Sequence, residues 1–354
     1  MSGKGRLQRE IEDVLARYRD AGYFPSACVR VFNGRETLAT AAIGEAEGAS
    51  VFDVASLTKI ATATQVLTAI RRGEISLHGK IADYLPETGE DPILRERMGS
   101  IDIYRLLTHT STLPAWYPFY TCREEEFFQA MKTALGRTEP TEGMVYSDLN
   151  FMLLGKMLER IRGKDLERCL QEDLVEPLGL GRMSYRPDPE WPIVPSSYGN
   201  PIEEEMCRER GLSFDGFRPA DHPVRGEVND GNSWYYFGGV AGHAGIFATA
   251  EAYEKLCRFY MTTADPLMKE AQREQADAPG RGLGLQTGIS YPHGCGHTGF
   301  TGTGIYFSRE ADIGVVSFTN RLFYPQENTN ETWEFRRVLQ EAAFALGGGG
   351  SLFD

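Results

Sequence analysis

Apolar positions along the first eighty residues follow two spacings, one typical of helices and one typical of strands. The first twenty residues place apolar side chains at helical spacing among charged ones, which predicts an amphipathic helix. Two strand-like runs follow between Ser26 and Gly44, and Asn33-Gly34 between them is a strong signal for a hairpin turn. Residues 55–72 return to helical spacing, and Gly73 suits the end of that helix.

In the rest of the chain, the predicted secondary structure changes twice. From residue 81 to 237, helical patterns dominate, separated by loops rich in Pro and Gly. A helix is then expected over 250–263, followed by two strand-like runs, 296–310 and 312–321. A last helix is expected over 330–346.

Strands therefore lie near both ends of the chain, with helices between them. The simplest architecture is an α+β fold in which the two ends share one antiparallel sheet covered by helices. We expect residues 1–80 and 238–354 to form this lobe and residues 81–237 to form a mostly helical lobe. A cleft between the lobes would be the default position of a binding site.

Charge and cysteine usage narrow the classes of protein. The 354 residues carry a formal net charge of −13, whereas nucleic-acid binding needs a basic stripe, so nucleic acid is not expected as the main partner. No apolar run reaches membrane-spanning length, and the charged first helix lacks the apolar core of a secretory signal. The six cysteines are scattered without a C-x-x-C pair, as expected for reduced thiols. These features predict a soluble cytoplasmic protein without metal or cofactor.

Ser56 and Lys59 stand three residues apart at the start of the helix expected over 55–72, in the only S-x-x-K of the chain. This spacing puts both on one helix face. A serine hydroxyl becomes nucleophilic when a neighbouring base takes its proton, and burial or positive potential can make a lysine amine that base. The alternative is that Ser56 only caps the helix. The motif alone leaves both interpretations open.

Two further elements could serve the same chemistry. Tyr146 precedes a strongly periodic helix and could pass protons, or it could simply pack at the helix start. His297-Thr298-Gly299 begins a glycine-rich strand whose edge could offer an N–H to an oxyanion, or it could be a bulge in a structural strand.

Taken in order, these three elements resemble the motifs of the serine β-lactamase and penicillin-binding-protein superfamily. The class C β-lactamase-like branch is the most similar, with S-x-x-K, then Y-x-N, then K-T-G or H-T-G. The stretches "GEISLHGKIADYLP", "LLTHTSTLP" and "GGVAGHAGIFATA" are also similar, so the resemblance spans nearly the whole chain. It implies the two-lobe fold of that branch, with the active site between the lobes.

The resemblance also implies roles for individual residues. Ser56 would be the acylated nucleophile, Lys59 would take or relay its proton, and Tyr146 would share the acid and base work. The backbone N–H groups of Ser56 and Phe300 would form the oxyanion hole. The chain would then act on a small molecule or a short peptide.

The third motif would supply the substrate-facing edge of the site, with one departure from the usual residues. His297 and Thr298 would line the substrate side of the strand, followed by Gly299. Histidine replaces the lysine that is usual at position 297, and a neutral imidazole gives up a fixed positive charge. Binding of a carboxylate such as that of β-lactam drugs would be weaker.

The second motif departs as well, because Asp148 replaces the asparagine of Y-x-N. An ionised aspartate only accepts hydrogen bonds, so Asp148 would favour a donor or an amine on the substrate, or it would hold Lys59. Thr112 stands where glycine is usual, without a functional explanation. The changes at 148 and 297 together favour an esterase or a D-amino-acid peptidase over a dedicated β-lactamase.

Several other features receive structural interpretations. The literal Y-x-N at residues 198–200 is rejected, because it lies in a Pro-rich loop with no expected helix after it. His243 is interpreted as part of a turn packed against the site, and the polar residues 229–232 as a turn at the rim of the cleft. The acidic run 203–205 is interpreted as a solvated face.

Two functions from different classes remain. One is a serine hydrolase that forms an acyl-enzyme on Ser56. The other is a non-catalytic relative that binds a peptide or acts as a scaffold. The presence of Ser56, Lys59 and Tyr146 together favours the hydrolase, since a binding module needs none of the three. The oligomeric state is left open.

Overall fold

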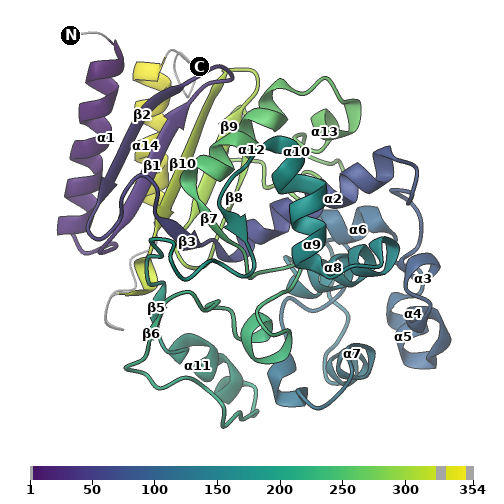
Figure 1. Ribbon diagram of the computed structural model, residues 1–354. Coiled ribbons are helices and arrows are strands. Elements are labelled where there is room, and N and C mark those ends of the chain that lie inside the picture. The colour runs from purple at the N-terminus through teal and green to yellow at the C-terminus, as the bar shows by residue number, and fades with distance from the viewer. Residues whose placement is uncertain (1–2, 324–331, 348–354) are drawn as a thin grey trace.

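The computed structural model describes residues 3–323 and 332–347, and its main sheet joins strands from both ends of the chain (Figure 1). The sheet is antiparallel, in the order β2-β1-β10-β9-β8. Its strands are β1 Ala27–Phe32, β2 Thr37–Ile43, β8 Cys295–Thr298, β9 Gly304–Ser308 and β10 Ile313–Thr319. Strand β1 pairs with β10 along its length, from Ala27 opposite Thr319 to Phe32 opposite Gly314. The architecture is the α+β fold predicted from the sequence.

The turns of this sheet agree with the sequence at one place and differ at another. Between β1 and β2, the Asn33 side chain accepts hydrogen bonds from the N–H groups of Arg35 and Glu36, which closes the expected hairpin. The run 296–310, expected as one strand, is instead two strands. It breaks at residues 299–303, where Gly302 adopts a φ of 110° that favours glycine.

Helices cover both faces of the sheet (Figure 1). Helices α1, Gly3–Asp20, and α14, Trp333–Gly347, pack together on one face. The first helix buries Leu7, Ile11, Val14, Leu15 and Tyr18, which confirms its predicted amphipathic pattern. Helix α12, Ala250–Thr262, packs on the opposite face. Residues 330–331 of the expected last helix lie outside the described ranges.

Helix α2, Thr58–Arg71, runs between the sheet lobe and the helical lobe and is buried on nearly every side. It can be buried because its polar side chains find partners. Thr64 and Thr68 each donate a hydrogen bond to the carbonyl oxygen four residues earlier. Small Ala and Thr side chains also let helix α8 approach closely. The helix that carries the S-x-x-K motif is therefore held rigidly.

The middle of the chain is mostly helical, as predicted, but it also contains short strands. Its helices are α3 Ile81–Tyr84, α4 Glu87–Glu90, α5 Pro92–Met98, α6 Ile103–Thr108, α7 Phe127–Gly136, α8 Asp148–Arg162, α9 Leu166–Leu170, α10 Glu176–Leu178 and α11 Pro201–Glu209. Of its short strands, β4 Met183–Ser184 pairs with β7 Phe247–Thr249, which also pairs with β3 Val51–Asp53, so this second sheet includes two strands from outside residues 81–237. Strand β5 Ser197–Tyr198 pairs with β6 Pro223–Val224. Helix α13 spans Pro266–Glu270. The lobe boundaries at 80/81 and 237/238 remain a proposal.

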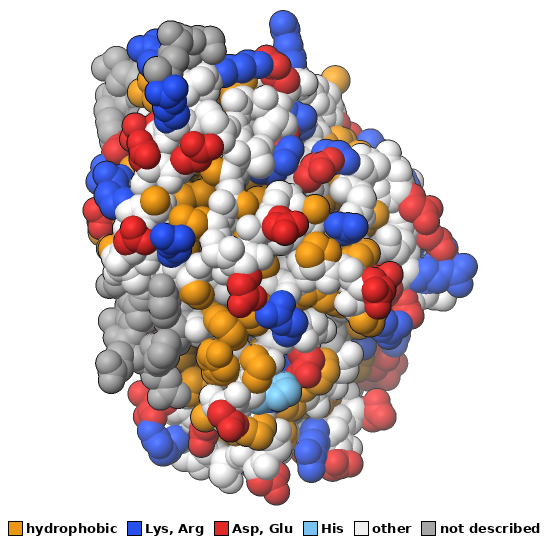
Figure 2. Space-filling model, turned by 60° about the vertical axis from the view of Figure 1, so that its left-hand side comes forward, with side chains coloured by type: hydrophobic (Ala, Val, Ile, Leu, Met, Phe, Trp, Pro, Cys, Tyr) orange, Lys and Arg blue, Asp and Glu red, His pale blue; other side chains and the backbone are white. Residues whose placement is uncertain are grey.

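The surface mixes charges of both signs. On the face shown in Figure 2, acidic and basic side chains are interspersed, and hydrophobic side chains form small groups between them. Among the helices of the described residues, none combines the length and the apolar character needed to cross a bilayer.

Candidate active site

Ser56 lies in a short 3-10 turn, Ala55–Leu57, between strand β3 and helix α2. The turn begins with Ala55 at a φ of 47°, a left-handed conformation that costs energy for a residue with a Cβ atom. Asp53 stabilises it, because its Oδ1 atom accepts a hydrogen bond from the Ala55 N–H at 2.8 Å. Its Oδ2 atom accepts one from the Asn229 N–H at 2.6 Å. The buried Asp53 thus ties the turn that presents Ser56 to the loop at 229–232.

Lys59 is fully buried one turn further along, and its ammonium group has three acceptors. Its Nζ atom lies 2.9 Å from Ser56 Oγ, 2.9 Å from the carbonyl oxygen of His243 and 2.8 Å from Asp148 Oδ1. Three N–H donors and three acceptors satisfy the charge without water. The Ser56 hydroxyl makes no capping bond at the start of the helix. Its partner is the lysine, as the catalytic interpretation requires.

The environment of Lys59 stabilises its charged form. Burial lowers the pKa of this amine, but the Asp148 carboxylate and Tyr146 outweigh burial and raise it to about 12. The amine therefore carries its proton at neutral pH in the absence of substrate. In this state Lys59 donates a hydrogen bond to Ser56 and cannot yet accept its proton.

Tyr146 lies next to the start of helix α8, between two cations. The Nζ atom of Lys59 lies 5.0 Å from the centre of the Tyr146 ring, and the guanidinium carbon of Arg281 lies 5.1 Å from the same point. His109 packs on the ring at 4.6 Å between centroids, and its Nδ1 atom accepts a hydrogen bond from the Ser147 N–H. Burial, together with Arg281 and Lys59, lowers the pKa of His109 well below its usual value. A neutral His109 therefore holds the segment that carries the tyrosine.

The third motif lies on β8, but its members face different directions. Thr298 lines the cavity beside Ser56, whereas His297 is 1% exposed and is not among the lining residues. The His297 Nδ1 atom lies 2.8 Å from the Thr298 carbonyl oxygen, which only accepts, so this nitrogen carries a proton. Burial and the nearby Lys59 lower the pKa of His297 well below its usual value. The expected place on the substrate side holds for Thr298 but not for His297.

Two residues that line the cavity have backbone N–H groups available for a ligand. They belong to Ser56 and Phe300, and neither has a hydrogen-bond acceptor in the described part of the chain. The loop that carries Phe300 is fixed to the turn of Ser56, because Thr303 Oγ1 donates to the Val54 carbonyl at 2.9 Å. Free N–H donors on two elements are the arrangement that an oxyanion needs.

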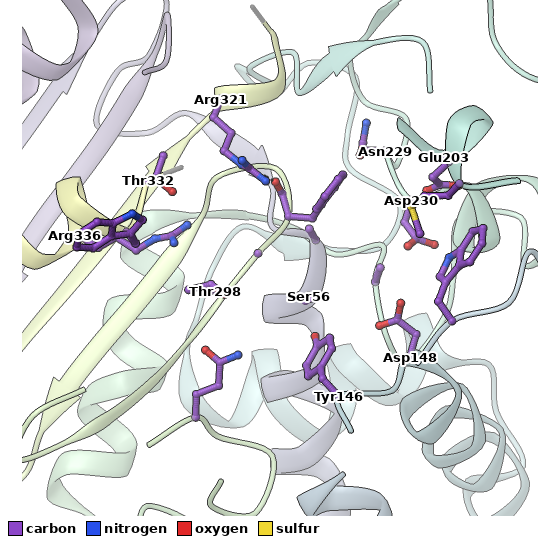
Figure 3. A pocket seen from close by; sticks show the side chains of 18 residues that line it. Ser56, Tyr146, Asp148, Glu203, Asn229, Asp230, Thr298, Arg321, Thr332 and Arg336 are labelled. Carbon is purple, nitrogen blue, oxygen red and sulfur yellow. Dashed lines mark hydrogen bonds between the residues drawn. The ribbon is translucent and has the colours of Figure 1, made fainter. Parts of the chain in front are cut away.

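These residues line a cavity of about 420 Å³ (Figure 3). Of the residues predicted from the sequence, the cavity brings together Ser56, Tyr146, Asp148, Thr298, Gly299 and Phe300. Lys59 lies behind Ser56, inside the protein. A second, mostly apolar cavity of about 640 Å³ adjoins the first and shares Gln286, Thr298, Trp333 and Arg336 with it.

Several residues at the site escaped the sequence analysis. Glu203 was interpreted as part of a solvated face, which is wrong: it is only 8% exposed and lines the cavity. Glu203 lies in the first turn of α11, and its neighbours Glu204 and Glu205 are exposed. Arg281 reaches Tyr146 from a distant loop that carries no motif. No motif in the sequence marked Glu203, because no helix was expected after residues 198–200.

Other interpretations fare differently. His243 does pack against the site, through its carbonyl contact with Lys59 and a contact between its Nε2 atom and Asp230 Oδ1 at 3.0 Å. Asn229 and Asp230 lie at the cavity, as the predicted polar turn suggested. The reason for rejecting the Y-x-N at 198–200 was wrong, because helix α11 follows it directly. The rejection itself stands, since Tyr198 stacks on Phe323 outside the cavity.

The family model described as Beta-lactamase matches residues 11–339. The chain belongs to the beta-lactamase family. The matched range includes Ser56–Lys59, Tyr146–Asp148 and His297–Gly299.

Two named proteins and one solved structure are similar to this chain over most of its length. N-acetylmuramyl-L-alanine amidase of Bacillus subtilis (strain 168) is 27% identical over 91% of this chain and 83% of its own length. A Salmonella agona protein provisionally named D-alanyl-D-alanine carboxypeptidase is 25% identical over 79% of this chain and 71% of its own. A class C beta-lactamase from Rhodobacter sphaeroides shares the fold, with a TM-score of 0.66 and 19% identity over 95% of this chain and 98% of that one.

Proposed function

We propose that this protein is a serine hydrolase that forms an acyl-enzyme on Ser56 and cleaves an amide or ester of a small molecule or short peptide. One observation carries the proposal: the Ser56 hydroxyl lies 2.9 Å from the buried Lys59 ammonium at a cavity where two backbone N–H groups lack acceptors. A nucleophile, a proton-handling group and an oxyanion site thus converge at one point.

The reaction divides into two steps. Ser56 Oγ attacks the substrate carbonyl, its proton passes to the leaving amine or alcohol, and an ester on Ser56 remains. Water then attacks this ester, giving up a proton to restore the serine and releasing the acid. Tyr146 and Lys59 would move the proton in both directions, while the N–H groups of Ser56 and Phe300 hold the developing oxyanion.

The substrate class follows from the charges at the motif positions. A neutral, buried His297 offers no fixed cation for the carboxylate of a β-lactam. The relatives named above as an amidase and a carboxypeptidase support amides of small peptides as the first substrates to test. An esterase or peptidase activity is therefore favoured over dedicated β-lactam hydrolysis.

Active-site labelling tests the proposal. The protein is incubated with a fluorophosphonate or with a penicillin, and the intact mass is measured. We expect a phosphonate adduct on the wild type and on Ser213→Ala, a change at an exposed serine outside the cavity, and none on Ser56→Ala. Absence of an adduct on folded wild type would favour the non-catalytic alternative. An adduct that persists on Ser56→Ala would remove Ser56 as the nucleophile.

A further inference from the structure

We propose that Arg281 is a positioning residue for acylation: its guanidinium stabilises the Tyr146 oxygen when that oxygen has given up its proton. The inference rests on the proposed function, because it assigns a role within the proton transfer between Tyr146 and Ser56. Arg281 belongs to none of the three sequence motifs and lies between α13 and β8. It is not among the residues that line either cavity, so it would act through Tyr146 and not on the substrate.

The guanidinium of Arg281 lies against Tyr146 and has no carboxylate partner. Its central carbon is 5.1 Å from the centre of the Tyr146 ring, which is the distance of a cation–π contact. In the described part of the chain the guanidinium forms no ion pair, and its buried Nε atom has no hydrogen-bond acceptor. Burial lowers the pKa of Arg281, but a guanidinium stays charged in proteins. A partly buried cation without a carboxylate is costly, so its position beside Tyr146 needs a reason.

Main-chain hydrogen bonds fix the loop that carries Arg281. The Gln275 N–H donates to the Arg281 carbonyl oxygen at 2.8 Å, and the Gly284 N–H donates to the Leu107 carbonyl oxygen at 3.0 Å. Gln286, further along the same loop, pairs with the edge of β8. Because the loop is held at several points, it presents Arg281 to the tyrosine from a fixed place.

Lys59 is the other cation near Tyr146, but its charge is already balanced. The Asp148 carboxylate lies 2.8 Å from the Lys59 Nζ atom, so this pair carries little net charge toward the phenol. Arg281 has no such pair within residues 3–323 and 332–347. The uncompensated positive charge at the Tyr146 ring is therefore that of Arg281, and its effect is strengthened by the exclusion of water around it.

Two histidines also pack against the Tyr146 ring, and neither adds a charge. The ring centroids of His109 and His297 lie 4.6 and 5.8 Å from that of Tyr146. Burial lowers the pKa of both imidazoles well below the usual value, and Arg281 and Lys59 add to this effect. Histidine at position 297 thus supplies no fixed positive charge, whereas Arg281 supplies one from a different element.

This charge matters at the moments when Tyr146 lacks its proton. In acylation a bond forms between Ser56 Oγ and the substrate carbonyl carbon, and the hydroxyl proton passes to the Tyr146 oxygen. The bond to the leaving amine or alcohol then breaks, and the same proton passes from Tyr146 to that group. The Tyr146 oxygen is negative before the first transfer and after the second. A nearby cation lowers the energy of this anion and so makes the oxygen available as a proton acceptor.

Fluorophosphonate labelling of Ser56 tests this role when binding of the probe (KI) is separated from the maximal rate (kinact). Arg281→Met removes the charge and keeps a long side chain against the ring. We expect kinact to fall about 10- to 100-fold, the usual effect of one nearby charge, while KI stays unchanged because Arg281 does not line the cavity. Arg281→Lys keeps the charge and should restore kinact to within about threefold of wild type. In a Tyr146→Phe background, Arg281→Met should slow labelling no further.

Arg273→Met is the matched control, because Arg273 lies in the same loop, is exposed and pairs with Glu270. It should leave both constants unchanged. Folded Arg281→Met with a wild-type kinact, or Arg281→Lys that labels as slowly as Arg281→Met, would overturn the inference. A change confined to KI would also overturn it. Where Arg281→Met fails to fold by circular dichroism, Arg281→Gln takes its place. Absence of labelling on the wild type would instead contradict the proposed function.

Discussion

The Asp148 carboxylate lies 2.8 Å from the Lys59 ammonium, so the residue that departs from the Y-x-N motif is paired with the lysine of the S-x-x-K motif. An asparagine at this position would offer Lys59 a neutral carbonyl oxygen, whereas aspartate offers a full negative charge. Of the two roles that the sequence left open for Asp148, the contact with Lys59 is the one observed. The remainder of its side chain still faces the cavity.

Asp148→Asn should change how easily Lys59 loses its proton. Without the carboxylate, burial dominates, and we expect the pKa of Lys59 to fall from about 12 by at least one unit. If neutral Lys59 accepts the serine proton, labelling of Ser56 at pH 8 should become about tenfold faster. The measurement is the rate of phosphonate labelling between pH 6 and 10. An unchanged profile would mean that Lys59 remains charged during acylation.

Tyr146→Phe tests the other candidate for proton transfer. Phenylalanine keeps the ring between Lys59 and Arg281 but removes the hydroxyl, so the fold should be unaffected. Loss of a general acid or base typically costs about 10²–10⁴-fold, and we expect labelling to slow within this range. Thermal unfolding measured alongside provides the control. A labelling rate within twofold of wild type would exclude the phenol from the reaction.

The elements that depend on neighbouring residues could be predicted from the sequence. The residues that tertiary packing brings to the site could not. The first helix and the Asn33-Gly34 hairpin depend on neighbours in the chain, so periodicity and turn chemistry suffice. The S-x-x-K pair is also local. Arg281 and Glu203 reach the site from loops and helices whose position depends on tertiary packing, and no spacing rule connects either one with Ser56.

The loop at 299–303 shows a further limit. Alternation of apolar and polar residues continued through it, so one strand was expected. The glycines there instead let the chain turn, and after this turn Phe300 lines the same cavity as Ser56. The tertiary position of this loop, at the candidate site, has thus overridden the local strand pattern.

Asp53→Asn should change the pH dependence of stability. Burial raises the pKa of Asp53 from its usual range to about 6, with Asp230 adding to the effect and Arg218 opposing it. Because the folded state holds this proton more tightly than the unfolded state, Asp53 makes the free energy of unfolding fall as pH rises from about 4 to 6. The contribution is about 2–3 kcal/mol at most. We expect denaturant titrations at pH 4, 5 and 7 to show wild type losing stability relative to the variant. A constant difference would contradict the assignment.

Gly299→Ala tests whether the placement of the Phe300 N–H matters for acylation. A Cβ atom at Gly299 would lie 2.1 Å from Thr303 Oγ1 and 2.4 Å from the Val54 carbonyl oxygen, both of which fasten this loop to the turn of Ser56. The loop must move to admit the methyl group, and the Phe300 N–H would move with it. Loss of one oxyanion donor costs about 10²–10³-fold, which is the slowing expected for phosphonate labelling. Gly48→Ala is the matched control, because nothing lies within 4 Å of a Cβ atom there. If both variants label at the wild-type rate, the Phe300 N–H does not hold the oxyanion.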